Sequence, residues 1–339
     1  MAVTSAPPRV AIVGAGLMGR WHAHAAQRLG AQVRVVVDPD RAAGATLASR
    51  HPGCRAVTDL ADALLEVDIV HVCSPAETHQ VLAAQALGAG RHTLVEKPLS
   101  ASVADTTALF EVAAAHQVQL CPVHQFPFQE GVRRALRESA RLGAIRHVDL
   151  RICSAGADGA DDVRRQQIAE EVLVHPFSLV ERVWPGSAGS VDWQVRCPLS
   201  GELHVTGVFD DATVSIVVSM RGRPPVNRME LVGERGTAHL DLFHGFMTVD
   251  GGRSTRAGKA ARPFTSAAAV GSAAAANLIR RARHGEAAYP GLRALIEAFY
   301  RAATGQAPPP IPRDEALAVA TACERVARTC TVQSPYPHG

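Results

Sequence analysis

The first third of the chain alternates short β-rich runs with longer helical stretches. The short runs are RVAIVGAG, QVRVVVD, CRAVTD, DIVHVCS and HTLVE. We expect the helices that follow them near residues 17–29, 40–50, 59–65, 77–89 and 102–116. Strands that alternate with helices in this way form parallel sheets, because each helix returns the chain to the same edge of the sheet. We therefore predict an α/β domain with a doubly wound parallel sheet over residues 1–123.

The pattern changes after residue 123. An amphipathic segment, FQEGVRRALRESARLG, leads into a set of strands that runs to about residue 250, and TVSIVVSM alternates apolar and other side chains with period two. The tail from residue 264 is helical. We predict an α+β domain for substrate binding and oligomerisation over residues 124–339, with a largely antiparallel open sheet and C-terminal helices that can pack back on the first domain.

Charge and cysteine usage exclude several classes of protein. The 35 Lys and Arg residues nearly balance 32 Asp and Glu residues, so we expect no nucleic-acid and no membrane partner. Seven dispersed cysteines without a CxxC pair predict reduced thiols, no disulfide framework and no metal site. No segment reads as a signal peptide or a membrane helix. We expect a soluble, cytoplasmic protein with a small-molecule partner.

A glycine motif lies between the first strand and the first helix. VAIVGAGLMG places Gly14, Gly16 and Gly19 as GxGxxG, with Leu17 and Met18 between the last two. The glycines allow a tight turn, a close approach of the backbone to a pyrophosphate and close packing of the helix on the strand, and the helix N-terminus attracts phosphate. These five residues are predicted to bind a dinucleotide, which makes residues 1–123 a dinucleotide-binding domain with a Rossmann doubly wound parallel sheet.

An acidic residue follows at the distance that the motif requires. Asp38 ends the second strand, where its carboxylate can accept hydrogen bonds from both hydroxyls of a ribose. The alternative is a turn aspartate before Pro39. An acid here repels a 2′-phosphate, so we expect NAD as the cofactor, with NADP as the less favoured alternative that Arg41 keeps open.

Lysine is rare in this chain. Only Lys97 and Lys259 are lysines, and Lys97 stands in HTLVEKPLS, at the end of a strand and before Pro98. A lysine amine is compact and can donate to an oxygen whose charge changes, whereas a guanidinium is planar, bulky and always protonated. We infer that Lys97 is used for lysine chemistry, against the alternative of a solvated strand end. Pro98 also makes a cis peptide bond available at this point.

Three motifs in this series, GAGLMG, VCSPAETH and LVEKPLS, resemble those of the Gfo/Idh/MocA oxidoreductases. The resemblance implies that Lys97 lies beside the nicotinamide and hydrogen-bonds the reacting oxygen. It also implies that Ser74, Pro75 and His79 lie along the cofactor, although a plain helix-start residue is an equal alternative for His79. Glu96 either pairs with Lys97 or secures the turn.

The second half of the implied site lies in IAEEVLVHPFSLVERV. Glu171 and His175 are one helical turn apart and are expected on one face of a helix. The family usually has Asp-x-x-x-His after a glycine-rich run, and its histidine transfers a proton. This chain has Glu171 in place of the aspartate and IAEE in place of the glycines. The alternative is a helix that merely buries His175.

The resemblance also suggests residues for substrate binding. His124 and Gln125, and with them Phe126 and Gln129, stand where the family enters its second domain, although a strand end and a first helical turn explain them equally well. The segment 164–167, Arg-Arg-Gln-Gln, is a further candidate for a ligand contact, against the favoured reading of a solvated loop.

The resemblance implies an NAD(P)-dependent oxidoreductase. By the same resemblance, it would transfer a hydride between nicotinamide C4 and a carbon that carries a hydroxyl or carbonyl group in a sugar, nucleotide-sugar, cyclitol or similar polyol. The alternatives are a lyase or glycosidase that uses NAD without net redox, and a non-catalytic dinucleotide sensor. Thr213, Ser215, Val217 and Ser219 suggest a sheet face of small side chains, so we expect a homodimer or homotetramer.

Overall fold

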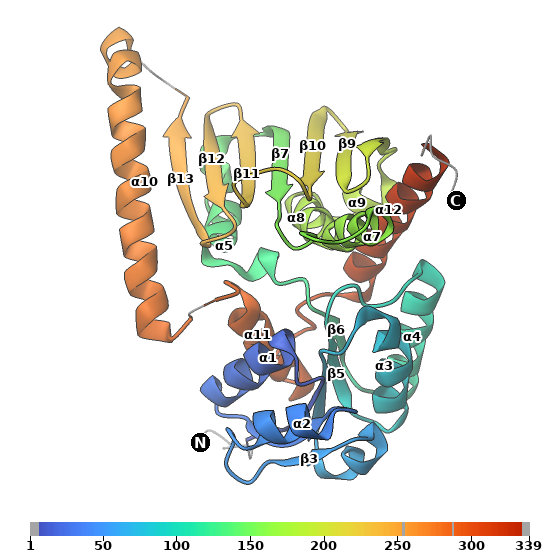
Figure 1. Ribbon diagram of the computed structural model, residues 1–339. Helices are drawn as coiled ribbons and strands as arrows, with labels where there is room; N and C mark the ends of the chain where they lie inside the picture. The colour runs from blue at the N-terminus through green and yellow to red at the C-terminus, as the bar shows by residue number, and fades with distance from the viewer. Residues whose placement is uncertain (1–6, 253–254, 287, 334–339) are drawn as a thin grey trace. The chain divides into compact units, whose positions relative to one another are not determined.

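The computed structural model describes residues 7–252, 255–286 and 288–333 (Figure 1). The chain forms two compact units. Unit 1 contains the residues up to His124 together with Leu292–Leu317, and unit 2 contains Gln125–Gly291 together with the residues from Ala318 on. The C-terminal segment is therefore divided between the two units. Each unit is described separately below.

Unit 1 contains a parallel sheet of six described strands, in the order β3-β2-β1-β4-β5-β6. The strand order reverses between β1 and β4, and ligands of doubly wound sheets bind beyond the carboxyl ends of the strands at such a point. The central strands are buried on both faces, which explains their continuous apolar runs. The strands are β1 (Arg9–Val13), β2 (Gln32–Val37), β3 (Arg55–Val57), β4 (Ile69–Val72), β5 (His92–Val95) and β6 (Leu120–Pro122).

The helices of unit 1 follow the predicted positions with one exception. They are α1 (Leu17–Arg28), α2 (Arg41–Ala48), α3 (His79–Gly88), α4 (Val103–Ala115) and α11 (Leu292–Ala303), with the short 3-10 helix η3 (Ala76–Thr78) before α3. In place of the helix predicted near residues 59–65 there are two 3-10 turns, η1 (Leu60–Asp62) and η2 (Leu64–Glu66). A longer helix does not form because the chain becomes extended at the buried Val67 and enters β4.

Unit 2 contains a sheet of seven described strands, in the order β13-β12-β11-β7-β10-β9-β8. Among these strands only β7 and β10 pair in parallel, so the prediction of a largely antiparallel sheet is confirmed. The predicted alternation in β10 is confirmed from Thr213 to Val218, since Val214, Ile216 and Val218 are buried and Thr213 is exposed. It is wrong at Ser219, which is buried at the end of the strand. The strands are β7 (Ile145–Cys153), β8 (Gln194–Leu199), β9 (Glu202–Phe209), β10 (Ala212–Ser219), β11 (Val226–Gly233), β12 (Gly236–Asp241) and β13 (Phe246–Gly251).

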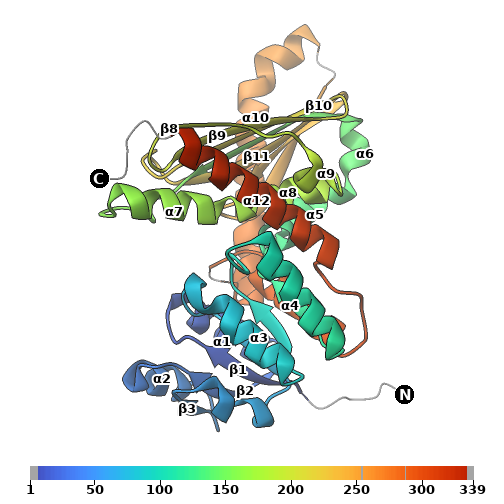
Figure 2. The ribbon, with the colours of Figure 1, turned by 90° about the vertical axis from the view of Figure 1, so that its right-hand side faces the viewer.

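Helices cover one face of this sheet, with α7, α8 and the later part of α12 below it in the view of Figure 2. Val319, Ala322 and Val326 of α12 pack into the same core as β10. The long helix α10 runs beside β13 at the edge of the sheet (Figure 1). The remaining helices are η4 (Phe126–Phe128), α5 (Glu130–Arg137), α6 (Ser139–Leu142), α7 (Asp162–Val172), α8 (Val174–Val183), α9 (Ser187–Ser190), α10 (Arg256–His284) and α12 (Arg313–Gln333).

The expectation that all cysteines are reduced thiols is wrong for this structure. Cys197 of β8 and Cys330 of α12 form a disulfide with an S–S distance of 2.03 Å, whereas the other five cysteines are free. The two residues are 133 positions apart, and the fold brings a strand and a helix together in a way that their spacing in the sequence does not reveal.

The outer face of the unit 2 sheet also carries more charge than the sequence suggested. Val217 of β10 aligns with Arg151 of β7, which in turn aligns with Arg228 of β11. Asp149 and Glu230 pair in the same way on this face. The small side chains of β10 therefore form one row of the face, and the neighbouring strands add charged rows.

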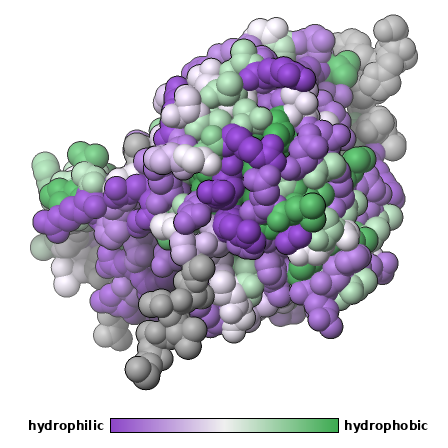
Figure 3. All heavy atoms as spheres, turned by 90° about the horizontal axis from the view of Figure 1, so that it is seen from below, coloured by the Kyte–Doolittle hydropathy of each residue, from purple (hydrophilic) through white to green (hydrophobic). Residues whose placement is uncertain are grey.

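The molecular surface is mixed in character. Hydrophilic side chains cover most of the face in Figure 3, with apolar groups between them. Within the described ranges, no helix has both the length and the apolar character that a bilayer crossing requires. In the same part of the chain, no group of three or more His, Cys, Asp and Glu side chains is placed to hold a metal ion.

Candidate active site

The glycine turn lies between β1 and α1 and is confined by its neighbours. A Cβ atom on Gly14, whose φ is +95°, would lie 2.8 Å from the carbonyl oxygen of Cys73, and one on Gly19 would lie 1.8 Å from the carbonyl oxygen of Gly14. A Cβ on Gly16 would meet no atom within 4 Å. The first and last glycines are thus required by close packing within the protein. Gly16, in contrast, leaves open space at the N-terminus of α1, where a pyrophosphate can approach the backbone. Leu17, the first residue of α1, is 61% exposed beside this space.

Asp38 stands directly after β2 and is held by backbone groups. Its Oδ2 accepts from the N–H of Ala15 at 2.7 Å, and its Oδ1 accepts from the N–H of Asp40 at 2.8 Å. These bonds fix the carboxylate next to the glycine turn, because Ala15 lies between Gly14 and Gly16. Each oxygen keeps a further lone pair for a ribose hydroxyl.

The loop after β4 is tied to the bend after β5 by His79. The ring of His79 is buried, with Nδ1 2.7 Å from the carbonyl oxygen of Pro98 and Nε2 2.9 Å from that of Ser74. Ser74 also shares a hydrogen bond of 2.6 Å with the hydroxyl of Thr78. His79 therefore ties the loop after β4 to the bend after β5. Both nitrogens of its ring face backbone carbonyl oxygens of the protein.

Lys97 lies in the bend after β5, and its peptide bond to Pro98 is cis. The backbone N–H of Lys97 donates to Oε2 of Glu96 at 3.1 Å, and Oε1 of Glu96 lies 3.0 Å from Nε2 of His22. Burial raises the pKa of the Glu96 carboxyl, but the hydrogen bond from His22 and the neighbouring Lys97 outweigh it, so this pKa lies below its ordinary value. Glu96 is thus an ionised, nearly buried carboxylate directly beneath the bend.

In unit 2, His175 is the second residue of α8, and its ring stacks on Phe126. The ring centroids are 4.1 Å apart and the planes differ by 7°. Phe126 belongs to η4, which follows Gln125, so the segment predicted to contact substrate fixes the plane of the histidine ring. The next aromatic residue of η4, Phe128, is covered by the guanidinium of Arg182 at 5.4 Å from its ring centroid.

Glu171 and His175 do not share one continuous helix, contrary to the expectation from their spacing. α7 ends at Val172 and α8 begins at Val174. Pro176 explains the interruption, because it has no N–H to donate to the carbonyl of Val172 and its ring crowds that carbonyl. The Glu171 carboxylate accepts a hydrogen bond of 3.0 Å from Arg164.

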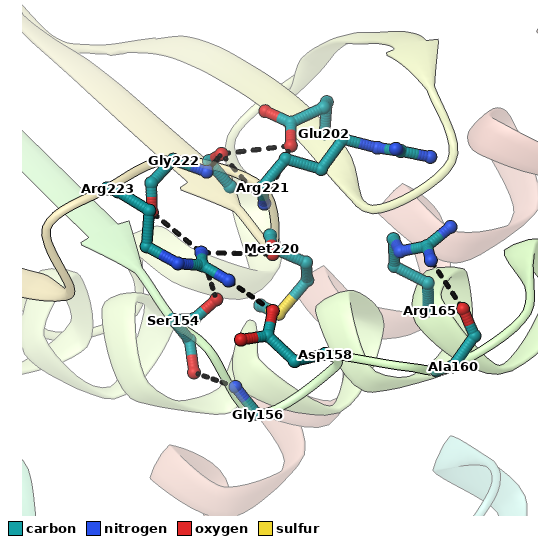
Figure 4. A network of polar contacts seen from close by, with 11 residues as sticks. Ser154, Gly156, Asp158, Ala160, Arg165, Glu202, Met220, Arg221, Gly222 and Arg223 are labelled. Atoms are coloured by element: carbon teal, nitrogen blue, oxygen red, sulfur yellow. Dashed lines mark hydrogen bonds and ion pairs between the residues drawn. The ribbon is translucent and has the colours of Figure 1, made fainter.

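Residues 164–167 belong to α7 instead of the solvated loop that was favoured. Arg165 bonds the carbonyl oxygen of Ala160 and the carboxylate of Asp162, and Oε1 of Gln166 accepts from the N–H of Gly201 at 3.0 Å. Figure 4 shows the surrounding loop, in which the guanidinium of Arg223 donates to the carboxylate of Asp158. It also donates to the backbone carbonyls of Ser154, Met220 and Gly222. These side chains are engaged by protein groups, and they hold the loop between β7 and α7.

The entrance to unit 2 is largely buried. His124, Gln125 and Gln129 have exposed fractions of 4%, 7% and 1%. The Gln129 amide donates to the carbonyl oxygen of Leu242 at 2.8 Å, so this residue joins η4 to the segment after β12. Gln129 therefore has a structural task, whereas the structure does not test the predicted substrate contacts of His124 and Gln125.

A doubly wound sheet with this glycine turn and an acid after β2 defines a dinucleotide-binding domain. Residues 8–124 match the Gfo/Idh/MocA oxidoreductase family with its NAD-binding Rossmann fold. Inositol 2-dehydrogenase 2 of Mycolicibacterium vanbaalenii is 30% identical over 263 residues, which cover 70% of this chain and 74% of the relative. The chain belongs to the Gfo/Idh/MocA family, and it is an NAD(P)-dependent dehydrogenase with NAD as its cofactor.

Solved structures show that the fold extends over nearly the whole chain. GenD2 from gentamicin A biosynthesis, in complex with NAD, aligns with a TM-score of 0.74 and 24% identity over 97% of this chain and 96% of its own. The WlbA dehydrogenase of Bordetella pertussis, in complex with NADH and UDP-GlcNAcA, aligns with a TM-score of 0.76 and 18% identity over 99% of this chain and 100% of its own. The fold of both units is therefore shared with these solved structures.

Proposed function

We propose that this dehydrogenase oxidises a CH–OH group of a cyclitol or a related polyhydroxylated small molecule, or catalyses the reverse reduction. Two relatives named as inositol dehydrogenases favour a cyclitol, since their matches cover 70% and 67% of this chain. The observation that carries the proposal is the position of Lys97 directly after the carboxyl end of β5, beside the buried carboxylate of Glu96, in a chain that has only one other lysine.

Residues of unit 1 would hold the cofactor. The backbone at Gly16, Leu17 and Met18 would face the pyrophosphate, and Asp38 would accept from the ribose hydroxyls. The loop of Ser74 and Pro75, tied down by His79, and the bend of Glu96 and Lys97 would border the nicotinamide. When it is bound, NAD supplies the C4 position that accepts or donates the hydride.

Two side chains would act on the reacting group, and three others would support them or bind the substrate. Lys97 would donate a hydrogen bond to the reacting oxygen and stabilise the charge that develops on it. His175, with its ring plane fixed by Phe126, would take the proton of the hydroxyl group in oxidation and return it in reduction. Glu171 would favour the protonated form of His175 by its negative charge, and His124 and Gln125 would contact the substrate hydroxyls.

The first experiment compares two lysine variants. Lys97→Met removes the amine from the bend, and Lys259→Met removes the exposed amine of α10 as the matched control. With NAD and a panel of cyclitols and sugars, followed at the NADH absorbance band, we expect Lys97→Met to lower kcat by about 10³-fold, the range of one electrostatic donor. NAD affinity should change little. Full turnover in Lys97→Met would contradict the proposed role.

A second comparison tests the proton transfer. His175→Gln should lower kcat by about 10²- to 10⁴-fold, as expected for the loss of a general acid or base. Glu171→Gln should lower it by about tenfold, a loss of ~1.4 kcal/mol, whereas Arg164→Gln frees the carboxylate and should preserve the rate. A wild-type pH–rate profile in His175→Gln would remove the histidine from the mechanism.

We further propose that the protein forms a dimer or tetramer in the cytoplasm through the outer face of the unit 2 sheet. The alternating basic and acidic rows of β7 and β11 support this, because Arg151 and Arg228 of one copy can meet Asp149 and Glu230 of another. A hollow of about 340 Å³ lies on this face beside α10. A monomeric mass in light scattering at micromolar concentration would contradict the assembly.

A further inference from the structure

Four polar side chains from four different elements meet inside unit 1. They are His22 of α1, His71 of β4, Glu96 after β5 and Tyr300 of α11, with exposed fractions of 0%, 0%, 7% and 7%. The Tyr300 hydroxyl is 3.1 Å from Nε2 of His71, Nδ1 of His71 is 3.0 Å from Nδ1 of His22, and Nε2 of His22 is 3.0 Å from Oε1 of Glu96. The four side chains form one continuous hydrogen-bonded chain, which we call the buried relay.

The donors of the buried relay can be assigned in order. Burial, with His22 beside it, holds the pKa of His71 well below its ordinary value, so its ring is neutral and has one donor and one acceptor. Glu96 is ionised and accepts from Nε2 of His22. The relay is complete when the Tyr300 hydroxyl donates to Nε2 of His71 and Nδ1 of His71 donates to Nδ1 of His22. Each donor then meets one acceptor.

Burying these four polar side chains in a protein interior costs desolvation free energy. Apolar side chains of similar volume at these positions would avoid the desolvation of a carboxylate and two imidazoles. Burial raises the pKa of the Tyr300 hydroxyl and, together with Glu96, that of the Cys73 thiol, so both stay protonated and add no charge. Because a hydrophobic core would serve stability at least as well, the relay points to a task other than holding the sheet together.

The buried relay draws on three of the segments that form the nucleotide site: α1, β4 and the bend after β5. His22 lies three residues after Gly19 in α1, and His71 lies in β4, just before the loop of Ser74. Its last member, Glu96, precedes Lys97 and accepts the backbone N–H of that residue. Tyr300 adds a residue from the C-terminal segment of unit 1. The relay therefore joins the pyrophosphate helix to the lysine bend.

We propose that Tyr300, His71 and His22 are positioning residues that hold the Glu96 carboxylate in one orientation and thereby fix Lys97 for its hydrogen bond to the reacting oxygen. The role of Lys97 in turnover rests on the proposed function above, but its dependence on the buried relay does not. Removal of the Tyr300 hydroxyl leaves Nε2 of His71 without its donor, and the assigned order of hydrogen bonds toward Glu96 is then lost.

The scarcity of lysine gives a direct readout. Protein labelled with [¹³Cε]lysine shows two side-chain signals, one from Lys97 and one from the exposed Lys259, which acts as an internal reference. Tyr300→Phe removes one oxygen from the relay, and His71→Asn is the second variant should the first fail to fold. Ile296→Val, at a buried apolar position one turn earlier in α11, is the control for a small loss of packing.

We expect Tyr300→Phe and His71→Asn to shift or broaden the Lys97 signal by more than its line width, with the Lys259 signal unchanged. Both variants should lower kcat about tenfold and change NAD affinity less than twofold, a split that general destabilisation would not give. Ile296→Val should leave the Lys97 signal and kcat as in the wild type.

Two results separate this inference from the proposed function. An unmoved Lys97 signal in folded Tyr300→Phe and His71→Asn overturns the inference, even if Lys97→Met abolishes turnover. A shifted Lys97 signal in these variants, together with full turnover in Lys97→Met, supports the positioning by the relay and overturns the catalytic role of the lysine.

Discussion

The two units prepare their parts of the chemistry in different ways. Unit 1 presents backbone groups at a strand–helix turn, where Gly14 and Gly19 are so confined that no other residue fits. Unit 2 presents a side chain, His175, whose ring plane depends on Phe126 from another element. A site built from backbone is fixed by local geometry, whereas a site built from side chains depends on packing between distant segments.

The largest effect should come from filling the backbone site. Gly19→Ala places a methyl group 1.8 Å from the carbonyl oxygen of Gly14, so α1 must move away from β1. We expect a loss of about 3 kcal/mol in the free energy of unfolding, at the upper end for overpacking, and no measurable NAD binding. Gly16→Ala is the control. It should fold with wild-type stability and bind NAD about tenfold more weakly, or ~1.4 kcal/mol. Titration calorimetry measures the NAD affinity and thermal melts measure the stability. A Gly19→Ala protein that binds NAD normally would contradict the comparison.

The same difference explains what could be predicted from the sequence. The Rossmann sheet and the glycine turn were predictable because strand periodicity and GxGxxG act within a few residues of each other. The break between α7 and α8 was also readable in principle, since Pro176 removes the bond to Val172, but the apparent one-turn spacing obscured it. The stacking of His175 on Phe126 and the buried relay depend on tertiary packing. Buried polar residues such as His71 give little signal, because a histidine in a strand is equally compatible with solvent.

A disulfide that the sequence did not suggest offers the next test. Opening the bond between Cys197 and Cys330 should destabilise unit 2 by ~2–4 kcal/mol, because the unfolded chain gains freedom. NAD affinity, a property of unit 1, should not change. Thiol titration in denaturant should count five thiols without reductant and seven with it. Seven thiols in protein purified without reductant would show that the bond does not form in solution.

Cofactor choice should respond to a single charge in unit 1. Asp38→Asn keeps an oxygen that can accept from the Ala15 N–H but removes the negative charge that repels a 2′-phosphate. We expect the ratio of NADP to NAD affinity to rise about tenfold, or ~1.4 kcal/mol. Asp40→Asn, which changes an exposed acid at the N-terminus of α2, is the matched control and should leave the ratio unaltered. Equal effects of the two variants would mean that Asp38 acts only through general electrostatics.

The smallest effect concerns the pH dependence of stability in unit 1. The folded pKa of His71 lies below its unfolded value of ~6.5, so below that pH the unfolded chain binds a proton that the folded chain excludes. Stability should therefore fall as the pH drops below ~6.5, by up to ~1.4 kcal/mol per pH unit for this one group.

The replacement His71→Leu should remove this contribution. The melting temperature should then depend less on pH in the range below ~6.5, the pKa of an unfolded histidine. Glu96 acts in a lower range, because its folded pKa lies below its unfolded value of ~4.3 and its contribution is lost only as the pH falls beyond that. His92→Leu is the control, since burial also lowers the pKa of His92 but its ring, at the opposite end of β5 from Glu96, accepts from the N–H of Gln119. If only His92→Leu reduced the dependence of the melting temperature on pH, the proton excluded on folding would be that of His92. The buried relay would then contribute nothing to the pH dependence.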